Sequence, residues 1–182
     1  MVFGGINFGG KLGSYTITNH STARLPQALA TAVSKLESNE LTGVGATYKA
    51  VWYLGAQVVN GKNYALVCEK TTSDKDATEE IVVVIINIPP QGAVTGEGAK
   101  VVEIIDKNNA TFDENLLANF KKAVAKLTGV GYIPILYFGT QVVKGINYFI
   151  IAQAKVENPY AVMVTMNVFE GDAKFVDIKP LR

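Results

Sequence analysis

The chain has 182 residues, of which 48% are hydrophobic and 18% are charged, and this composition supports a sizeable core and argues against intrinsic disorder. The formal net charge of +1 leaves no cationic surplus for a nucleic-acid duplex, and the longest apolar run, 81–88, is too short to cross a bilayer as a helix. A single cysteine and a single histidine cannot form a disulfide or a cysteine- or histidine-rich metal centre, so we expect no cofactor and no metal.

The first half of the chain predicts one helix followed by antiparallel strands. An apolar stripe at helical spacing marks the helix, formed by Leu25, Leu29, Val33 and Leu36. The period then changes to two over 48–58, which is typical of a long strand with one buried face. The next residues predict a tight turn, because Asn-Gly at 60–61 accepts the positive φ values that such a turn needs. Further strands are expected at 63–70, 79–88 and 99–106.

The second half predicts the same succession of elements. Its helix is marked by Leu116, Leu117, Phe120, Val124 and Leu127. Thr111 and Glu114 have the spacing of a capping box at the start of this helix. Pro134 cannot donate a ladder hydrogen bond, so we expect it at an edge or a bulge. The strands are expected at 132–142, 147–156, 160–169 and 173–178.

The two halves also repeat each other in sequence. The ten residues 55–64 return 84 positions later as 139–148, with seven identities. Upstream, the sequence Leu-Thr-Gly-Val-Gly occurs at 41–45 and again at 127–131. A repeat of this kind predicts two similar structural units. We place the first at 1–95 and the second at 96–182, and we leave open whether the 99–106 strand is shared by both.

A helix followed by a long antiparallel meander with Gln-Val-Val-x-Gly at its first hairpin resembles the cystatin family. The motif occurs twice, as Gln57-Val58-Val59-Asn60-Gly61 and as Gln141-Val142-Val143-Lys144-Gly145, each followed by Asn-Tyr. The resemblance implies an α+β fold of two cystatin-like units, each with one helix packed on a curved antiparallel β-sheet. No disulfide is implied, because the chain has one cysteine.

The resemblance also implies a function. Cystatins are reversible inhibitors of papain-like cysteine proteases and insert a wedge of hairpin loops and an N-terminal segment into the protease groove. By this analogy the partner is a protein, the chain is not an enzyme, and both Gln-Val-Val-x-Gly tips are candidate contacts. Gly4 and Gly5 would be auxiliary contacts in the N-terminal arm of the first repeat. Two valines beside a turn should then be exposed as an apolar surface that a partner covers.

Other interpretations of the same residues remain open. The chain could be a non-inhibitory protein-binding or assembly module, or an inhibitor of another protease class, as in latexin-like tandem repeats. The valines of both tips could also pack inward. We expect Cys68 and Trp52 to be core residues and His20 to be a turn or capping residue, because no nucleophile and base are paired in the sequence. Without a recognisable secretory signal, a cytoplasmic location is expected.

Overall fold

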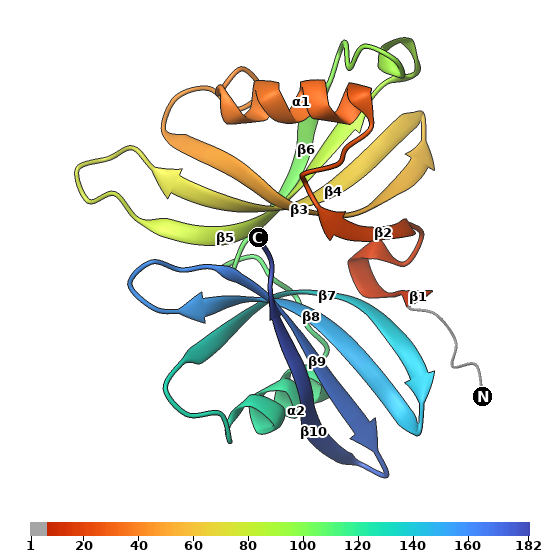
Figure 1. The fold of residues 1–182 in the computed structure, drawn as a ribbon, viewed down its shortest axis with the longest axis vertical. Coiled ribbons are helices and arrows are strands. Elements are labelled where there is room, and N and C mark those ends of the chain that lie inside the picture. Colours follow the sequence, from red (N-terminus) through yellow and green to blue (C-terminus); the bar gives the residue numbers. More distant parts are fainter. Residues whose placement is uncertain (1–6) are drawn as a thin grey trace. The chain divides into compact units, whose positions relative to one another are not determined.

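The computed structural model describes residues 7–182, which form two compact units, each built on a five-stranded antiparallel sheet (Figure 1). One unit is continuous in sequence and comprises residues 15–106. The other comprises residues 7–14 together with 107–181. The repeat boundary therefore differs from the expected division into 1–95 and 96–182.

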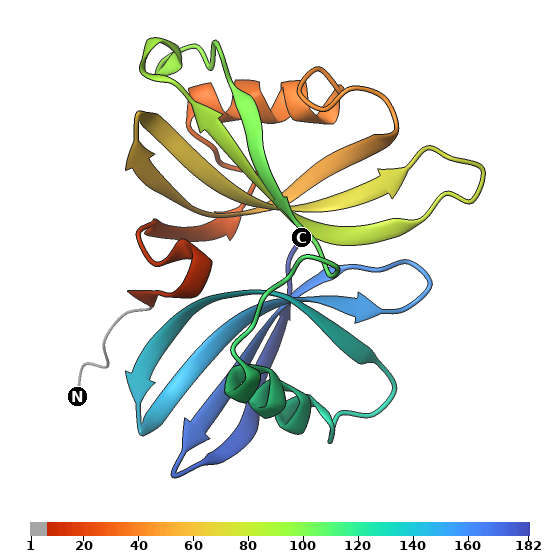
Figure 2. The same ribbon diagram turned by 180° about the vertical axis from the view of Figure 1, so that it is seen from behind.

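The continuous unit has the strand order β2-β3-β4-β5-β6. Helix α1 lies across one face of this sheet (Figure 2). Its buried residues join a core with alternating side chains of β3, β4 and β5. The strand expected at 99–106 closes this sheet as β6 and pairs with β5. The elements are β2 (Thr16–Ser21), α1 (Gln27–Glu37), β3 (Ala46–Val59), β4 (Gly61–Thr72), β5 (Glu79–Ile88), the 3-10 helix η2 (Pro90–Gly92) and β6 (Lys100–Ile105).

The discontinuous unit has the strand order β1-β7-β8-β9-β10. Its first strand comes from the beginning of the chain: Asn7 pairs with Thr140 and Phe8 with Gly139. Pro134 lies at a register shift of β7, as expected for a residue that cannot donate a ladder hydrogen bond. The elements are β1 (Asn7–Phe8), the 3-10 helix η1 (Gly10–Leu12), α2 (Glu114–Val124), β7 (Gly131–Val143), β8 (Gly145–Lys155), β9 (Ala161–Phe169) and β10 (Asp172–Pro180).

The expected α+β class of two cystatin-like units is wrong. The chain is mainly β, with 49% strand and 16% helix and two antiparallel sheets. The physical reason lies in the strands: residues 50–55 of β3 and 81–86 of β5 are buried in unbroken runs, so both faces of these strands are apolar. Alternation in the sequence predicts only one buried face. Register shifts within β3, between Ala50 and Trp52 and between Tyr53 and Gly55, break the period of two.

The start of helix α2 also differs from the expectation. Its N-cap is Asp113, whose carboxylate accepts hydrogen bonds from the backbone amides of Asn115 at 2.9 Å and Leu116 at 3.2 Å. Thr111 therefore does not cap the helix. Asp113 satisfies two orphan amides and places its negative charge at the positive end of the helix dipole.

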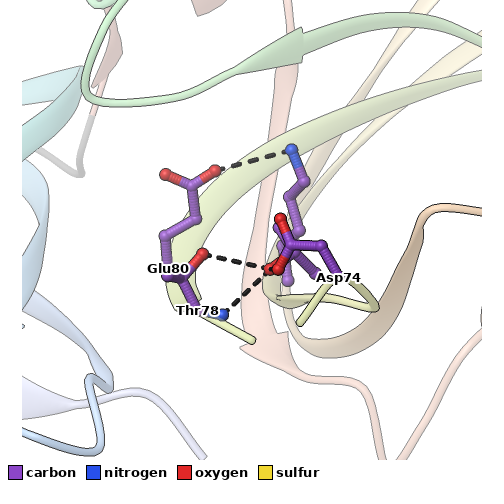
Figure 3. Close-up of polar contacts among 5 residues, drawn as sticks. Asp74, Thr78 and Glu80 are labelled. Carbon is purple, nitrogen blue, oxygen red and sulfur yellow. Dashed lines mark hydrogen bonds and ion pairs between the residues drawn. The ribbon is translucent and has the colours of Figure 1, made fainter. Parts of the chain in front are cut away.

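Side chains close the turn between β4 and β5 (Figure 3). The backbone amide of Thr78 donates to Thr72 Oγ1 at 2.9 Å, and Thr72 Oγ1 lies 3.2 Å from Asp74 Oδ1. One step into the strands, Lys70 Nζ and Glu80 Oε1 are 3.5 Å apart. These contacts account for Asp74 and Glu80 as local structure. Within residues 7–182, no helix is long and apolar enough to cross a membrane.

Candidate functional site

The β3–β4 turn forms the first candidate tip, which we call tip 1 (residues 57–61). Asn60 stands between the paired residues Val59 and Gly61. Val58 is 80% exposed and Val59 is 42% exposed. Both valines therefore present apolar surface to solvent, as the sequence predicted, rather than packing inward.

A ladder of side-chain amides runs across three strands behind tip 1. Asn63 Nδ2 donates to Gln57 Oε1 at 3.1 Å, and Asn87 Nδ2 donates to Asn63 Oδ1 at 3.0 Å. Asn87 Nδ2 also lies 3.5 Å from the carbonyl oxygen of Asn60 at the turn itself. Gln57 thus supports the turn from one side. The sequence motif indicated Gln57 as a contact residue but gave no role to Asn63 or Asn87.

Gly61 is required at tip 1 for two reasons. Its φ is +83°, which is the left-handed region that favours glycine. A Cβ at this position would also overlap the Ile88 carbonyl oxygen and lie 2.7 Å from Pro89 Cα. The turn is therefore pressed directly against the segment that follows β5.

This close approach creates a mainly apolar groove beside tip 1. The groove has a volume of about 300 Å³, and Lys62 is the one charged residue among those that line it. Its remaining lining residues are Val58, Val59, Gly61, Tyr64, Ile88, Pro89, Pro90 and Ala93. Tip 1 and the Pro89–Pro90 segment thus form one continuous surface, although they are about 30 residues apart in the sequence.

The β7–β8 turn forms the corresponding tip 2 (residues 141–145). Val142 is 64% exposed, whereas Val143 is half-buried. Asn167 Nδ2 donates to Asn147 Oδ1 at 3.1 Å and to the Lys144 carbonyl oxygen at 3.0 Å. Gln141 pairs with Asn147 in the strand register, as Gln57 does with Asn63. In both tips, therefore, an asparagine side chain of the neighbouring strand supports a backbone carbonyl of the turn.

The surroundings of tip 2 differ chemically from those of tip 1. Its groove of about 350 Å³ is lined by Lys144, Asn167, Phe169, Asp172 and Lys174. Lys144 Nζ stands 5.3 Å from the centroid of the Phe169 ring. Asp172 Oδ1 is 3.1 Å from Lys122 Nζ, and this hydrogen-bonded lysine lowers the pKa of the Asp172 carboxyl. Tip 2 therefore combines apolar and charged surface.

The remaining candidates lie elsewhere. Gly4 and Gly5 fall outside the described residues. Cys68 is fully buried in the core of the 15–106 unit, and burial raises the pKa of its thiol, so it is suited to packing and not to nucleophilic chemistry. Trp52 is 5% exposed and donates to Asn19 Oδ1 at 2.8 Å. The His20 ring stacks edge-on against Tyr53 with centroids 5.5 Å apart, which differs from the expected capping role.

No family model, curated protein or solved structure matches the chain. The resemblance to cystatins therefore stays a prediction from the two motifs. Among the described residues, no group of three or more His, Cys, Asp or Glu side chains could hold a metal ion. In the described part of the chain, each of the two tips combines an exposed valine with a neighbouring groove, a shape suited to a partner.

Proposed function

We propose that the protein is a reversible, non-catalytic inhibitor of papain-like cysteine proteases that binds through tip 1. One observation carries the proposal: Val58, with four fifths of its surface exposed, stands at the end of a braced hairpin beside an apolar groove. An exposed valine at a rigid tip gains free energy when a partner covers it. Full burial of such a side chain contributes about 1.5–3 kcal/mol.

The bracing of tip 1 supports a binding role. The Gln57–Asn63–Asn87 ladder and the packed Gly61 hold the turn in one conformation before any partner arrives. A preformed tip loses less conformational entropy on binding than a loose loop does. The groove beside it extends the apolar contact to Pro89 and Pro90. A narrow apolar edge of this kind suits an elongated cleft.

The auxiliary contacts expected from Gly4 and Gly5 are not part of the proposal. The strand that follows them, β1, pairs with β7 and so belongs to the unit that carries tip 2. The proposal rests on the described residues of tip 1, Val58, Val59, Asn60 and Gly61. A cytoplasmic site of action is also part of the proposal, and the single buried cysteine supports it, since it is suited to a reducing compartment.

Titration of papain with the full chain tests the proposal. We expect inhibition that Val58→Asp abolishes, because a carboxylate at the tip cannot enter an apolar cleft without losing its hydration. Val142→Asp is the matched control at tip 2 and should leave the inhibition unchanged. Circular dichroism of each variant establishes that the fold is retained. Papain activity that is unchanged at micromolar protein would exclude the proposal.

Carboxypeptidase A is the second enzyme in the experiment. Inhibition of this metalloprotease alone would favour the latexin-like alternative over the proposal. Inhibition of neither enzyme would favour a non-inhibitory binding module. Equal loss of papain inhibition in the Val58→Asp and Val142→Asp variants would show that tip 1 does not act by itself.

A further inference from the structure

The two grooves lie on opposite faces of their sheets and differ in charge. The tip 1 groove is lined by Val58, Lys62 and Ile88, which face away from the amide ladder. The tip 2 groove is lined by Asn167, which belongs to the amide ladder. At tip 1 the segment facing the turn is Ile88-Pro89, and at tip 2 it is Val168-Phe169. One charged residue lines the tip 1 groove, whereas three line the tip 2 groove. The charged residues at tip 2 are Lys144, Asp172 and Lys174. A difference in both face and charge indicates that the two grooves receive different partners.

The charge at tip 2 is predominantly positive. Asp172 is already engaged, with Oδ1 3.1 Å from Lys122 Nζ and Oδ2 3.8 Å from Lys174 Nζ. Lys126 also acts on the Asp172 carboxylate by its charge. Lys144 lies across the groove over Phe169 and forms no ion pair with any described residue. Even with Glu170 of the adjoining turn counted, four lysines oppose two carboxylates.

The lysines are accessible to a partner. The Lys174 side chain is 75% exposed and that of Lys122 is 57% exposed. Apolar surface lies beside Lys144, because the Phe169 ring next to it is 39% exposed. Cations beside an exposed ring complement a chain in which carboxylates alternate with small apolar side chains.

We propose that the groove at tip 2 binds an extended acidic peptide segment of a partner protein. Its carboxylates pair with Lys144 and Lys174, and an apolar side chain covers Phe169. Electrostatic complementarity gives this site its selectivity and makes its affinity depend on salt. The inference does not depend on the inhibitor proposal, which concerns tip 1.

Fluorescence anisotropy with the full chain tests the proposal. The probe is a fluorescein-labelled peptide of about ten residues in which Glu alternates with Ala, and the control peptide carries Gln in place of Glu. We expect the Glu peptide to bind about tenfold more tightly than the Gln peptide, and its affinity to fall as salt rises from about 20 to 200 mM. Equal binding of the two peptides would overturn the proposal.

Variants locate the site. The double variant Lys144→Gln, Lys174→Gln should weaken binding of the Glu peptide by about tenfold, whereas Lys62→Gln, at the exposed lysine of the tip 1 groove, should not change it. Asp172→Asn should strengthen binding by about twofold or more, because it removes a negative charge from the groove. Undiminished binding by the double variant, or weaker binding by Asp172→Asn, would contradict the proposal.

Two further measurements test other roles for the tip 2 groove. The first asks whether the groove contributes to papain inhibition, and the second asks whether it binds nucleic acid. The double variant should keep any inhibition of papain, because tip 1 is untouched. A single-stranded oligonucleotide should bind more weakly than the Glu peptide, since the groove offers few cations over a short length. Tighter binding of the oligonucleotide, lost in the same double variant, would replace the peptide proposal with a nucleic-acid site.

Discussion

Gly61 shows how one residue fixes the shape of tip 1. Any larger residue would have to adopt φ +83° and displace the carbonyl of Ile88, the last residue of β5, which is paired with Lys62 of β4. We expect Gly61→Ala to destabilise the protein by more than about 2 kcal/mol, the sum of an unfavourable backbone conformation and a steric overlap. Urea denaturation of the full chain measures this change.

Gly43 provides the matched control for that experiment. It has a similar φ of +75°, but no atom lies within 4 Å of the position of its Cβ. Gly43→Ala should therefore cost about 1 kcal/mol, which is the backbone term alone. Equal stability of the two variants would show that tip 1 is not closely packed against Ile88.

Tyr15 makes stability depend on pH in the alkaline range. Burial, and then the charge of Glu103, raise the pKa of Tyr15 from 10.0 to about 12. The folded state therefore holds this proton more tightly than the unfolded state does. The resulting stabilisation is fully present below pH 10 and is lost as the pH rises from 10 to about 12.

The Tyr15→Phe variant isolates this contribution. Its urea midpoint should decline less steeply between about pH 10 and 11.5 than that of the parent chain, because phenylalanine has no proton to lose. A spectrophotometric titration at the tyrosinate absorption band should show one fewer late-titrating group. Identical pH dependence of the two proteins would show that Tyr15 is not the group responsible.

The amide ladders show which part of the candidate site could not be predicted from local residue patterns. The exposure of Val58 followed from its place beside a turn, which is a local feature. The roles of Gln57 and Asn87 depend on which strands are neighbours, and these two residues are 30 positions apart. The recurrence of asparagine at 63 and 147, directly before tyrosine in both repeats, was the signal for the ladders.

At the scale of elements, strands were predicted better than helix ends or strand faces. The apolar run at 81–88 lies within the strand expected at 79–88, and β5 is observed over these residues. The burial of both strand faces was missed, because register shifts are set by pairing with a neighbour. The capping box was missed as well, since Asp113 and Thr111 both have side-chain oxygens that can accept a hydrogen bond from a helix amide.

The helix α2 cap yields a prediction. Asp113→Ala should destabilise the protein by about 1 kcal/mol, because two backbone amides lose their acceptor and the helix dipole loses a favourable charge. Thr111→Ala is the control, and its effect should be within about 0.5 kcal/mol of zero. Thermal denaturation followed by circular dichroism measures both. A larger effect of Thr111→Ala would show that Thr111 caps the helix, as the capping box in the sequence predicted.

At the scale of the whole molecule, strand β1 departs from the order of the chain, which the other described strands follow within their sheets. The first strand of the 107–181 sheet comes from residues 7–8, which precede the entire 15–106 unit. A two-residue strand has no periodicity of its own, and its pairing with Gly139 and Thr140 spans about 130 positions. Local pattern therefore indicated two consecutive repeats, whereas the contacts make one unit discontinuous.

This connectivity predicts that a deletion at the start of the chain will act on its second half. Removal of residues 1–14 deletes β1 and η1, including the hydrogen bond from the Gly9 amide to the Phe138 carbonyl at 3.0 Å and the fully buried Leu12. Loss of a buried leucine alone costs about 2–5 kcal/mol. Hydrogen exchange measured by mass spectrometry should show faster exchange in β7 and its neighbours, with β3–β5 little changed. Removal of residues 1–6 alone keeps β1 and should leave β7 protected. Faster exchange confined to residues 15–106 would instead assign the N-terminal strand to the first sheet.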